Sequence, residues 1–171
     1  ACGTPTDPIL ILLGALRKKS LFWQPSSSML ASCMKFSEII NPEQILLDLQ
    51  ATDRWLTIEE LGGWLVKQKR IDESRRDAVI QAVKTREKSM STGIGFGIAI
   101  PHASTDAIDK VTAALARSSR GINFDSLDGQ PVKLVVLFLV PTGQYQQHLK
   151  TLASISRFLN DREFREQAEQ A

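Results

Sequence analysis

The segment 132–140 constrains the fold of this chain more than any other, because it contains an unbroken apolar run from Leu134 to Val140. An alternating pattern would indicate a strand with one face in water. A continuous run of branched and aromatic residues is instead typical of a strand that is covered on both faces. Such a strand needs helices on either side of its sheet. The sequence therefore predicts an α/β (α+β) protein in which a mixed β-sheet is sandwiched between helices.

The rest of the chain supplies candidate elements for this arrangement. Thr57 as N-cap, Glu60 at the capping-box position and a staple of Leu56 with Leu61 predict that a helix begins there. Helical periodicity and turn residues predict further helices over 74–88, 145–159 and 162–170, and strands over 98–100, 111–117 and 132–140.

The first 33 residues differ in pattern from the rest. The apolar run 9–13 is too short to span a membrane, and basic residues follow it rather than precede it as in a secretory signal. The polar stretch 24–28 is typical of a linker. We therefore expect an extension over 1–33 and one domain over 34–171. The first interpretation of this extension is a docking or membrane-surface segment. The second, which is favoured, is simply an upstream extension or a packing helix.

Charge and cysteine content exclude several classes of protein. Lysine and arginine number 21 against 19 aspartate and glutamate, so the net charge of +2 gives no reason to expect a nucleic-acid partner. The only cysteines are Cys2 and Cys33, too few for a disulfide scaffold or a zinc cluster. We expect a cytoplasmic protein without a metal ion and without a membrane span.

Glycine and histidine spacing exclude further chemistry. Gly93, Gly95 and Gly97 form GxGxG before a strand, whereas a dinucleotide fingerprint is GxGxxG after one. The chain has neither a P-loop nor a GxSxG elbow. The two histidines, His102 and His148, would need carboxylate partners to hold a metal, and no such cluster is specified.

Arg86 occupies an unusual place in the helix predicted to end near residue 88. It follows Ala82 by four residues and Val83 by three, and it thereby continues the apolar stripe of that helix. A guanidinium on a buried stripe must be paired or must await an anion. Alternatively, the long side chain extends past the end of the helix into solvent, and helix geometry alone favours that interpretation.

His102 combines several features of a phosphoryl acceptor, although a single histidine is more often structural or merely exposed. It follows the stiff residue Pro101 after a glycine-rich turn, and a neutral imidazole is nucleophilic towards phosphorus at pH 7. His148 lies near the start of a predicted helix, where anions are favoured. Candidate donors to the phosphoryl oxygens lie at the end of the helix predicted over 74–88 and at the start of the glycine-rich turn. They are Arg86, Ser91, Thr92 and the backbone at Gly93.

The stretch from Arg86 to Ala103 strongly resembles the active-site signature of fructose/mannitol-type enzyme IIA domains of the bacterial phosphoenolpyruvate-dependent phosphotransferase system. The resemblance continues through 121–125, 127–132 and 148–153 and covers about residues 34–170. It implies a mixed sheet between helices and no cofactor. It departs from the family pattern at Met90, where glycine is common, and at Ala103-Ser104, where Gly-Arg is common. The second departure removes a basic side chain near the site.

The resemblance also implies roles for three residues. His102 would accept phosphate from the phosphohistidine of the histidine phosphocarrier protein, His148 would orient and stabilise the phosphoryl group, and Arg86 would contact it. The sequence around 124–132 and 155–159 is more similar to the nitrogen-regulatory branch, whose phosphorylation state controls a downstream protein. The alternatives are a sugar-transport enzyme IIA that passes phosphate to an enzyme IIB, and a non-catalytic interaction module of the same fold.

Overall fold

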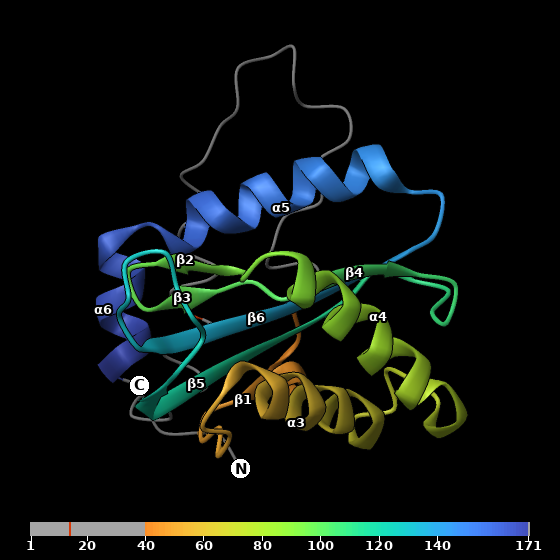
Figure 1. Ribbon diagram of the computed structural model, residues 1–171, viewed down its shortest axis with the longest axis horizontal. Helices are drawn as coiled ribbons and strands as arrows, with labels where there is room; N and C mark the ends of the chain where they lie inside the picture. The colour runs from red at the N-terminus through yellow and green to blue at the C-terminus, as the bar shows by residue number, and fades with distance from the viewer. Residues whose placement is uncertain (1–13, 15–39, 171) are drawn as a thin grey trace.

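The computed structural model describes Gly14 and residues 40–170, which form one mixed six-stranded sheet with helices on both faces (Figure 1). The helices are α3 (Arg54–Lys67), α4 (Arg76–Ser89), α5 (Tyr145–Leu159) and α6 (Arg162–Gln170), with short 3-10 turns η1 (Pro42–Gln44) and η2 (Glu73–Arg75). The strands are β1 (Ile45–Leu46), β2 (Gly93–Gly95), β3 (Ile98–Ala99), β4 (His102–Thr105), β5 (Thr112–Ile122) and β6 (Val132–Pro141).

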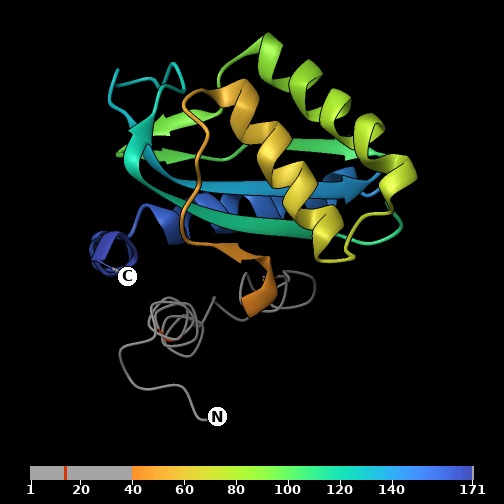
Figure 2. The same cartoon turned by 90° about the horizontal axis from the view of Figure 1, so that it is seen from below.

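Strand β6 is buried on both faces, as its sequence predicts. Leu134, Val136 and Phe138 point into a core shared with α5 and α6. Val135 and Leu137, which alternate with them, point into a second core shared with α3 and α4. The sheet therefore lies between two helical layers, with α5 on one side and α3 on the other (Figures 1 and 2). This confirms the predicted sandwich.

Strands β3 and β4 are two pieces of one interrupted strand. Both pair with β6 in parallel and with the same offset, since Ile98 is opposite Leu134 and His102 is opposite Phe138. The interruption falls at Ile100 and Pro101, and proline has no N–H for the ladder. The carbonyl of Pro101 still accepts from the N–H of Phe138 at 2.9 Å. The break therefore leaves the register unchanged.

Helix α3 begins three residues before the predicted cap. Asp53 is the N-cap, and its carboxylate accepts from the N–H groups of Trp55 and Leu56 at 2.8 and 3.0 Å. The prediction that Thr57 caps this helix is wrong, because its hydroxyl donates to the Asp53 carbonyl. Glu60 accepts from the backbone before the helix, and Leu56 is exposed, so neither the predicted box nor the staple forms.

The remaining predicted elements are found, some of them with altered limits, such as the helix predicted over 74–88, which is α4. The helices predicted over 145–159 and 162–170 and the strand over 132–140 are confirmed. The strand predicted over 111–117 extends to Ile122, and the region around 93–105 contains three short strands rather than one. The apolar run 9–13, the linker 24–28 and the domain start near Met34 lie outside the described residues.

Candidate active site

His102 is the first residue of β4, directly after the break in the interrupted strand. Its neighbour Ala103 points into the core shared with α3 and α4. Since side chains alternate along a strand, the half-buried ring of His102 lies on the opposite face, which α5 covers. The sequence thus places a histidine at the edge of a core, on a rigid element rather than in a loop.

The backbone of Ile100 sets the tautomer of His102. The imidazole Nδ1 lies 2.8 Å from the carbonyl oxygen of Ile100. A carbonyl can only accept a hydrogen bond, so Nδ1 carries the proton, and in the neutral ring Nε2 carries the lone pair. Burial lowers the pKa of His102 below its ordinary value of 6.5, the hydrogen bond to Ile100 opposes that shift, and the charge of Arg86 adds to it. The ring is therefore held neutral and nucleophilic at Nε2.

We expect Arg86→Gln to raise the pKa of His102, because the substitution removes a nearby positive charge that lowers it. Titration of the imidazole by NMR, with His102→Ala to assign the signal, measures this shift. A pKa that stays constant or falls would contradict the electrostatic contact.

The lowered pKa of His102 also determines how the free energy of unfolding changes with pH. As pH falls below 6.5, the unfolded chain binds the proton first, so the wild type loses stability between 6.5 and the folded pKa.

Arg86 lies in the last turn of α4, but not on its buried stripe. The inward face of the helix consists of Val79, Ile80, Val83 and Glu87. The prediction that Arg86 continues this stripe is wrong, because successive steps of four residues from Val79 lead to Glu87 instead. Arg86 is half-buried, and its guanidinium donates to the Met90 carbonyl at 3.0 Å, just past the helix end. None of the ion pairs in the described part of the chain involves it.

Glu87 is the buried polar residue that the sequence interpretation missed. Its side chain is only 1% exposed, and both carboxylate oxygens accept from Thr92. The backbone N–H of Thr92 lies 3.0 Å from one oxygen, and the hydroxyl lies 2.6 Å from the other. The four-residue step from Val79 through Val83 to Glu87 was the signal that could have located it.

The donors predicted at Ser91, Thr92 and Gly93 each make a hydrogen bond within the protein. The Ser91 hydroxyl donates to the Phe124 carbonyl at 2.6 Å and accepts from the Gly93 N–H at 3.1 Å. Both donors of Thr92 bind Glu87. Their contribution to phosphate binding stays a prediction, and it requires an exchange of these bonds.

Gly93 is required for close packing rather than for an unusual dihedral angle. A Cβ on this residue would lie 2.8 Å from Cβ and 2.9 Å from Cα of Ser126, so backbone would have to move. We expect Gly93→Ala to destabilise the protein by about 1–3 kcal/mol in urea unfolding. The matched control is Gly63→Ala within α3, where the nearest atom lies at 3.9 Å. That control should be neutral or should stabilise by up to about 1 kcal/mol. Equal effects of the two substitutions would contradict the packing argument.

The turn between β2 and β3 is held by a hydrogen bond to the loop 126–130. Gly95, Phe96 and Gly97 all have positive φ, at 92°, 54° and 73°, and Phe96 is the one that carries a side chain. The carboxylate of Asp128 accepts from the Phe96 N–H at 2.8 Å. The N–H groups of Gln130 and Phe96 lower the pKa of Asp128. The hairpin and the loop 126–130 therefore form one hydrogen-bonded unit.

His148 is the fourth residue of α5, the helix that covers the face on which His102 lies. Its side chain is outside the described part of the structure. The structure thus brings Arg86 close to His102 and puts His148 on the facing helix, while the contact between the two histidines stays a prediction.

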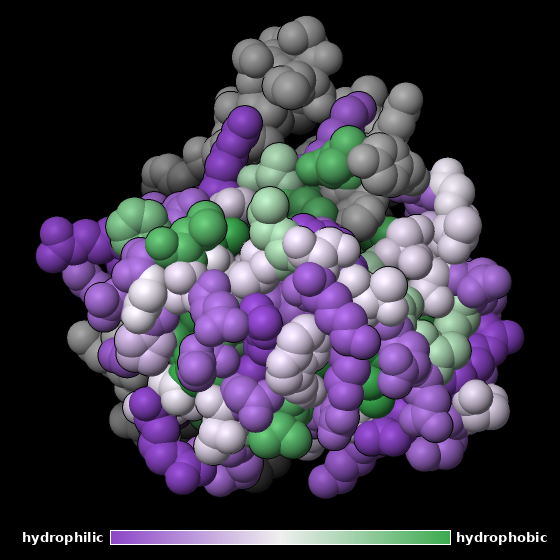
Figure 3. Space-filling model, in the orientation of Figure 1, coloured by the Kyte–Doolittle hydropathy of each residue, from purple (hydrophilic) through white to green (hydrophobic). Residues whose placement is uncertain are grey.

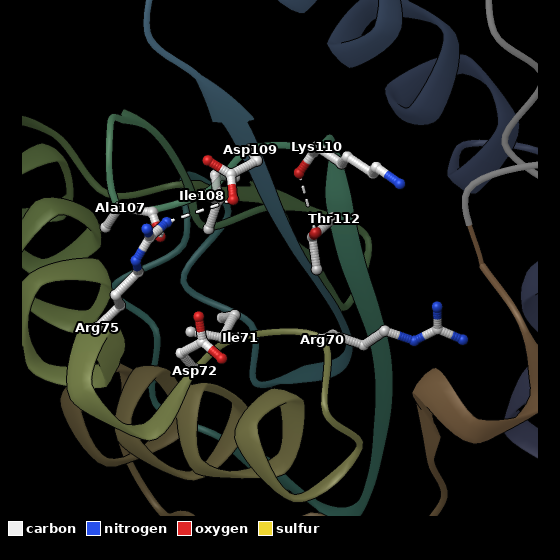
Figure 4. Close-up of a pocket in the computed structure, with 9 residues that line it drawn as sticks. All are labelled: Arg70, Ile71, Asp72, Arg75, Ala107, Ile108, Asp109, Lys110 and Thr112. Atoms are coloured by element: carbon white, nitrogen blue, oxygen red, sulfur yellow. Dashed lines mark hydrogen bonds and ion pairs between the residues drawn. The ribbon is translucent and has the colours of Figure 1, made fainter.

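A separate pocket of about 160 Å³ opens between the α3–α4 connection and the β4–β5 connection (Figure 4). Buried Ile71, Ile108 and Thr112 line its interior. At its edge, Arg75 points to Asp109 at 3.4 Å and is thus already paired. No candidate site residue from the sequence lines this pocket.

The outer surface is largely hydrophilic on the face seen in Figure 3, with apolar side chains in small separate patches. No helix among the described residues is both long and apolar enough to cross a bilayer. The same part of the chain contains no group of three or more histidine, cysteine, aspartate or glutamate residues that could hold a metal ion.

Comparison with known proteins identifies the family. Residues 38–171 match the family described as phosphoenolpyruvate-dependent sugar phosphotransferase system, EIIA 2. The chain is 42% identical over 130 residues to the fructose-specific EIIA component of Haloferax volcanii, covering 76% of this chain and 83% of that protein. It is 37% identical, with the same coverage, to a nitrogen regulatory protein of Bradyrhizobium diazoefficiens.

The fold agrees with a solved relative. The crystal structure of nitrogen regulatory protein IIA-Ntr from Neisseria meningitidis superimposes with a TM-score of 0.71 and 30% identity, over 78% of this chain and 90% of that one. The fold and these matches define an enzyme IIA of a phosphotransferase system. The chain belongs to the EIIA 2 family, the fructose/mannitol type.

Proposed function

We propose that this chain is a phosphoryl carrier that accepts phosphate on Nε2 of His102 from the phosphohistidine of a histidine phosphocarrier protein. The observation that carries the proposal is the hydrogen bond from Nδ1 to the Ile100 carbonyl, because it leaves the lone pair on Nε2. The neutral ring needs no base to activate it. Membership of the enzyme IIA family supports the same assignment.

The transfer step balances without a cofactor. The Nε2 lone pair forms a bond to phosphorus while the bond from phosphorus to the donor's histidine nitrogen breaks, and that nitrogen keeps the electron pair. Positive charge develops on the His102 ring as the new bond forms. The Ile100 carbonyl, which already accepts from Nδ1, stabilises that charge without reorganisation.

Arg86 and His148 are proposed to bind the phosphoryl group. The Arg86 guanidinium caps the end of α4 beside His102, and a planar cation with several donors suits phosphoryl oxygens. His148, in the first turn of α5, is placed where backbone N–H groups and the helix dipole favour an anion. Ser91, Thr92 and Gly93 are proposed to support this site from the turn that follows α4.

The regulatory branch is the role that we propose for the carrier. Support comes from the likeness to IIA-Ntr of Neisseria meningitidis and from several relatives named nitrogen regulatory protein. In this role the phosphorylation state of His102 controls binding to a downstream protein in the cytoplasm. Residues 1–33 are proposed as an extension to this domain, and the start of the family match at residue 38 supports that division.

A sugar-transport role is the second candidate. The 42% identity to the fructose-specific EIIA component of Haloferax volcanii favours it. In this role the phosphoryl group passes from His102 to an enzyme IIB and then to a sugar.

The first experiment incubates the protein with phosphoenolpyruvate, enzyme I and the phosphocarrier protein, followed by intact-mass measurement. One added phosphoryl group that is lost in acid supports the carrier. No addition to a folded protein would overturn it in favour of the non-catalytic interaction module. The phosphorylated protein is then mixed with fructose-type and mannitol-type enzyme IIB. Rapid transfer to either supports transport, and retention on His102 supports regulation.

A further inference from the structure

Glu87 is a buried carboxylate that the proposed phosphoryl transfer does not use directly. It lies on the buried face of α4, in the last turn of the helix, and is 1% exposed. Among the described residues no lysine or arginine forms an ion pair with it. A carboxylate in such a place is costly unless donors satisfy its oxygens. Here a single residue, Thr92, supplies both donors.

Thr92 connects Glu87 to the backbone beside His102. Its carbonyl oxygen accepts from the Ile100 N–H at 3.0 Å. The carbonyl of Ile100 in turn lies 2.8 Å from Nδ1 of His102. Glu87, Thr92, Ile100 and His102 thus form one series of hydrogen bonds that runs from the end of α4 to the imidazole.

The Ile100 carbonyl takes no part in the ladder with β6. The carbonyls that accept from β6 are those of the alternate residues Gly97 and Pro101, so the Ile100 carbonyl points away from β6. The Thr92 carbonyl holds Ile100 by its N–H instead. Thr92 is itself held in two places by Glu87, through its backbone N–H and its hydroxyl.

We propose that Glu87 is a positioning residue for phosphoryl acceptance, acting through Thr92 and the Ile100 carbonyl to keep the proton of His102 on Nδ1. This inference rests on the proposed function only for its consequence on the transfer rate. The control of the tautomer is a property of the resting protein. It also gives Thr92 a task different from direct phosphate binding.

The alternative is that Glu87 merely ties the end of α4 to β2. That role predicts a less stable protein whose His102 ring is unchanged. The two roles are separated by the ¹⁵N chemical shifts of the imidazole, which report directly which ring nitrogen carries the proton.

The test compares four variants by ¹⁵N NMR, thermal unfolding and phosphotransfer rate. Glu87→Met keeps the volume but loses both contacts with Thr92. We expect a shift towards the Nε2–H tautomer and phosphoryl acceptance about 10–100-fold slower, by analogy with the loss of partners that orient metal-binding histidines. Glu87→Gln can keep both contacts, because its amide oxygen can accept from the Thr92 N–H while its amide NH2 donates to the Thr92 hydroxyl. This variant should therefore remain near wild type in tautomer and rate.

The two other variants complete the design. Thr92→Val removes only the hydroxyl donor and should change the tautomer in the same direction as Glu87→Met but less. Val79→Ala, on the same buried face of α4, destabilises the helix packing without touching the series and should leave the tautomer unchanged.

Several outcomes would overturn the inference. One is a wild-type tautomer in Glu87→Met, whatever its rate, and another is a Glu87→Gln variant as impaired as Glu87→Met. If Glu87→Met does not fold, an unchanged tautomer in Thr92→Val would have the same force. If the wild type accepts no phosphoryl group at all, the proposed function fails, yet the NMR comparison still tests the positioning role.

Discussion

Replacement of His102 by alanine is expected to abolish the acid-labile phosphoryl group completely while the protein stays folded. The ring is half-buried, and its Nδ1 hydrogen-bonds to the backbone carbonyl of Ile100, two residues away. The register of β4 is fixed by β6 and its two cores rather than by the histidine. Removal of the ring should therefore change the free energy of unfolding by no more than about 1–2 kcal/mol.

Intact mass before and after acid treatment, with urea unfolding of the same sample, measures both halves of this prediction. The chain has one other histidine, His148. An acid-labile group on His102→Ala would therefore indicate that His148 is the acceptor, and it would refute the assignment to His102. A variant that fails to fold would show that His102 is structural.

Replacement of Arg86 by alanine is expected to slow phosphoryl acceptance by about 10²–10³-fold, the range found when one donor to a developing anion is removed. The structural cost should be small. Arg86 gives up one hydrogen bond to the Met90 carbonyl at the end of α4, which is worth about 0.5–1.5 kcal/mol. Arg86→Lys keeps the charge but lacks the planar guanidinium. Its rate of phosphoryl acceptance should therefore lie between those of the wild type and Arg86→Ala.

Lys88→Ala is the matched control for Arg86→Ala, because it removes an exposed cation from the same helical turn. Single-turnover transfer from the phosphorylated phosphocarrier, together with urea unfolding, gives rate and stability for all three variants. Equal slowing by Lys88→Ala would reduce the role of Arg86 to general charge attraction. A loss of folding in Arg86→Ala would make its side chain a helix cap and no more.

Those parts of the fold that depend on hydrophobic periodicity could be predicted from the sequence. The apolar run 134–140 specifies a strand with two buried faces, and α5 and α6 follow from their repeats. Local capping was less informative. Asp53 and Thr57 are both good caps, and the choice between them depends on the chain before the helix, where Asn123 pairs with Asp53 in an isolated bridge.

The sequence predicts which residues form the candidate site, but it does not predict the directions of their side chains. The sequence draws attention to Arg86 and His102. The predicted buried face of α4 is nevertheless shifted by about one residue, so that Arg86 is predicted in the place that Glu87 occupies. Helical periodicity over a short stripe tolerates that error, since positions 82 and 83 are both apolar. The tautomer of His102 could not be predicted at all, because it depends on the direction of the Ile100 carbonyl in the folded chain.

The constant register across that break has a consequence for the proposed phosphoryl carrier. His102 is attached to β6, the strand at the centre of both cores, so its position shares the stability of the whole domain. If His102 is the acceptor that we propose, we expect its surroundings to keep their shape when it is phosphorylated. The two forms of the proposed carrier would then differ chiefly in electrostatic potential, and a partner that distinguishes them would detect negative charge rather than a new shape.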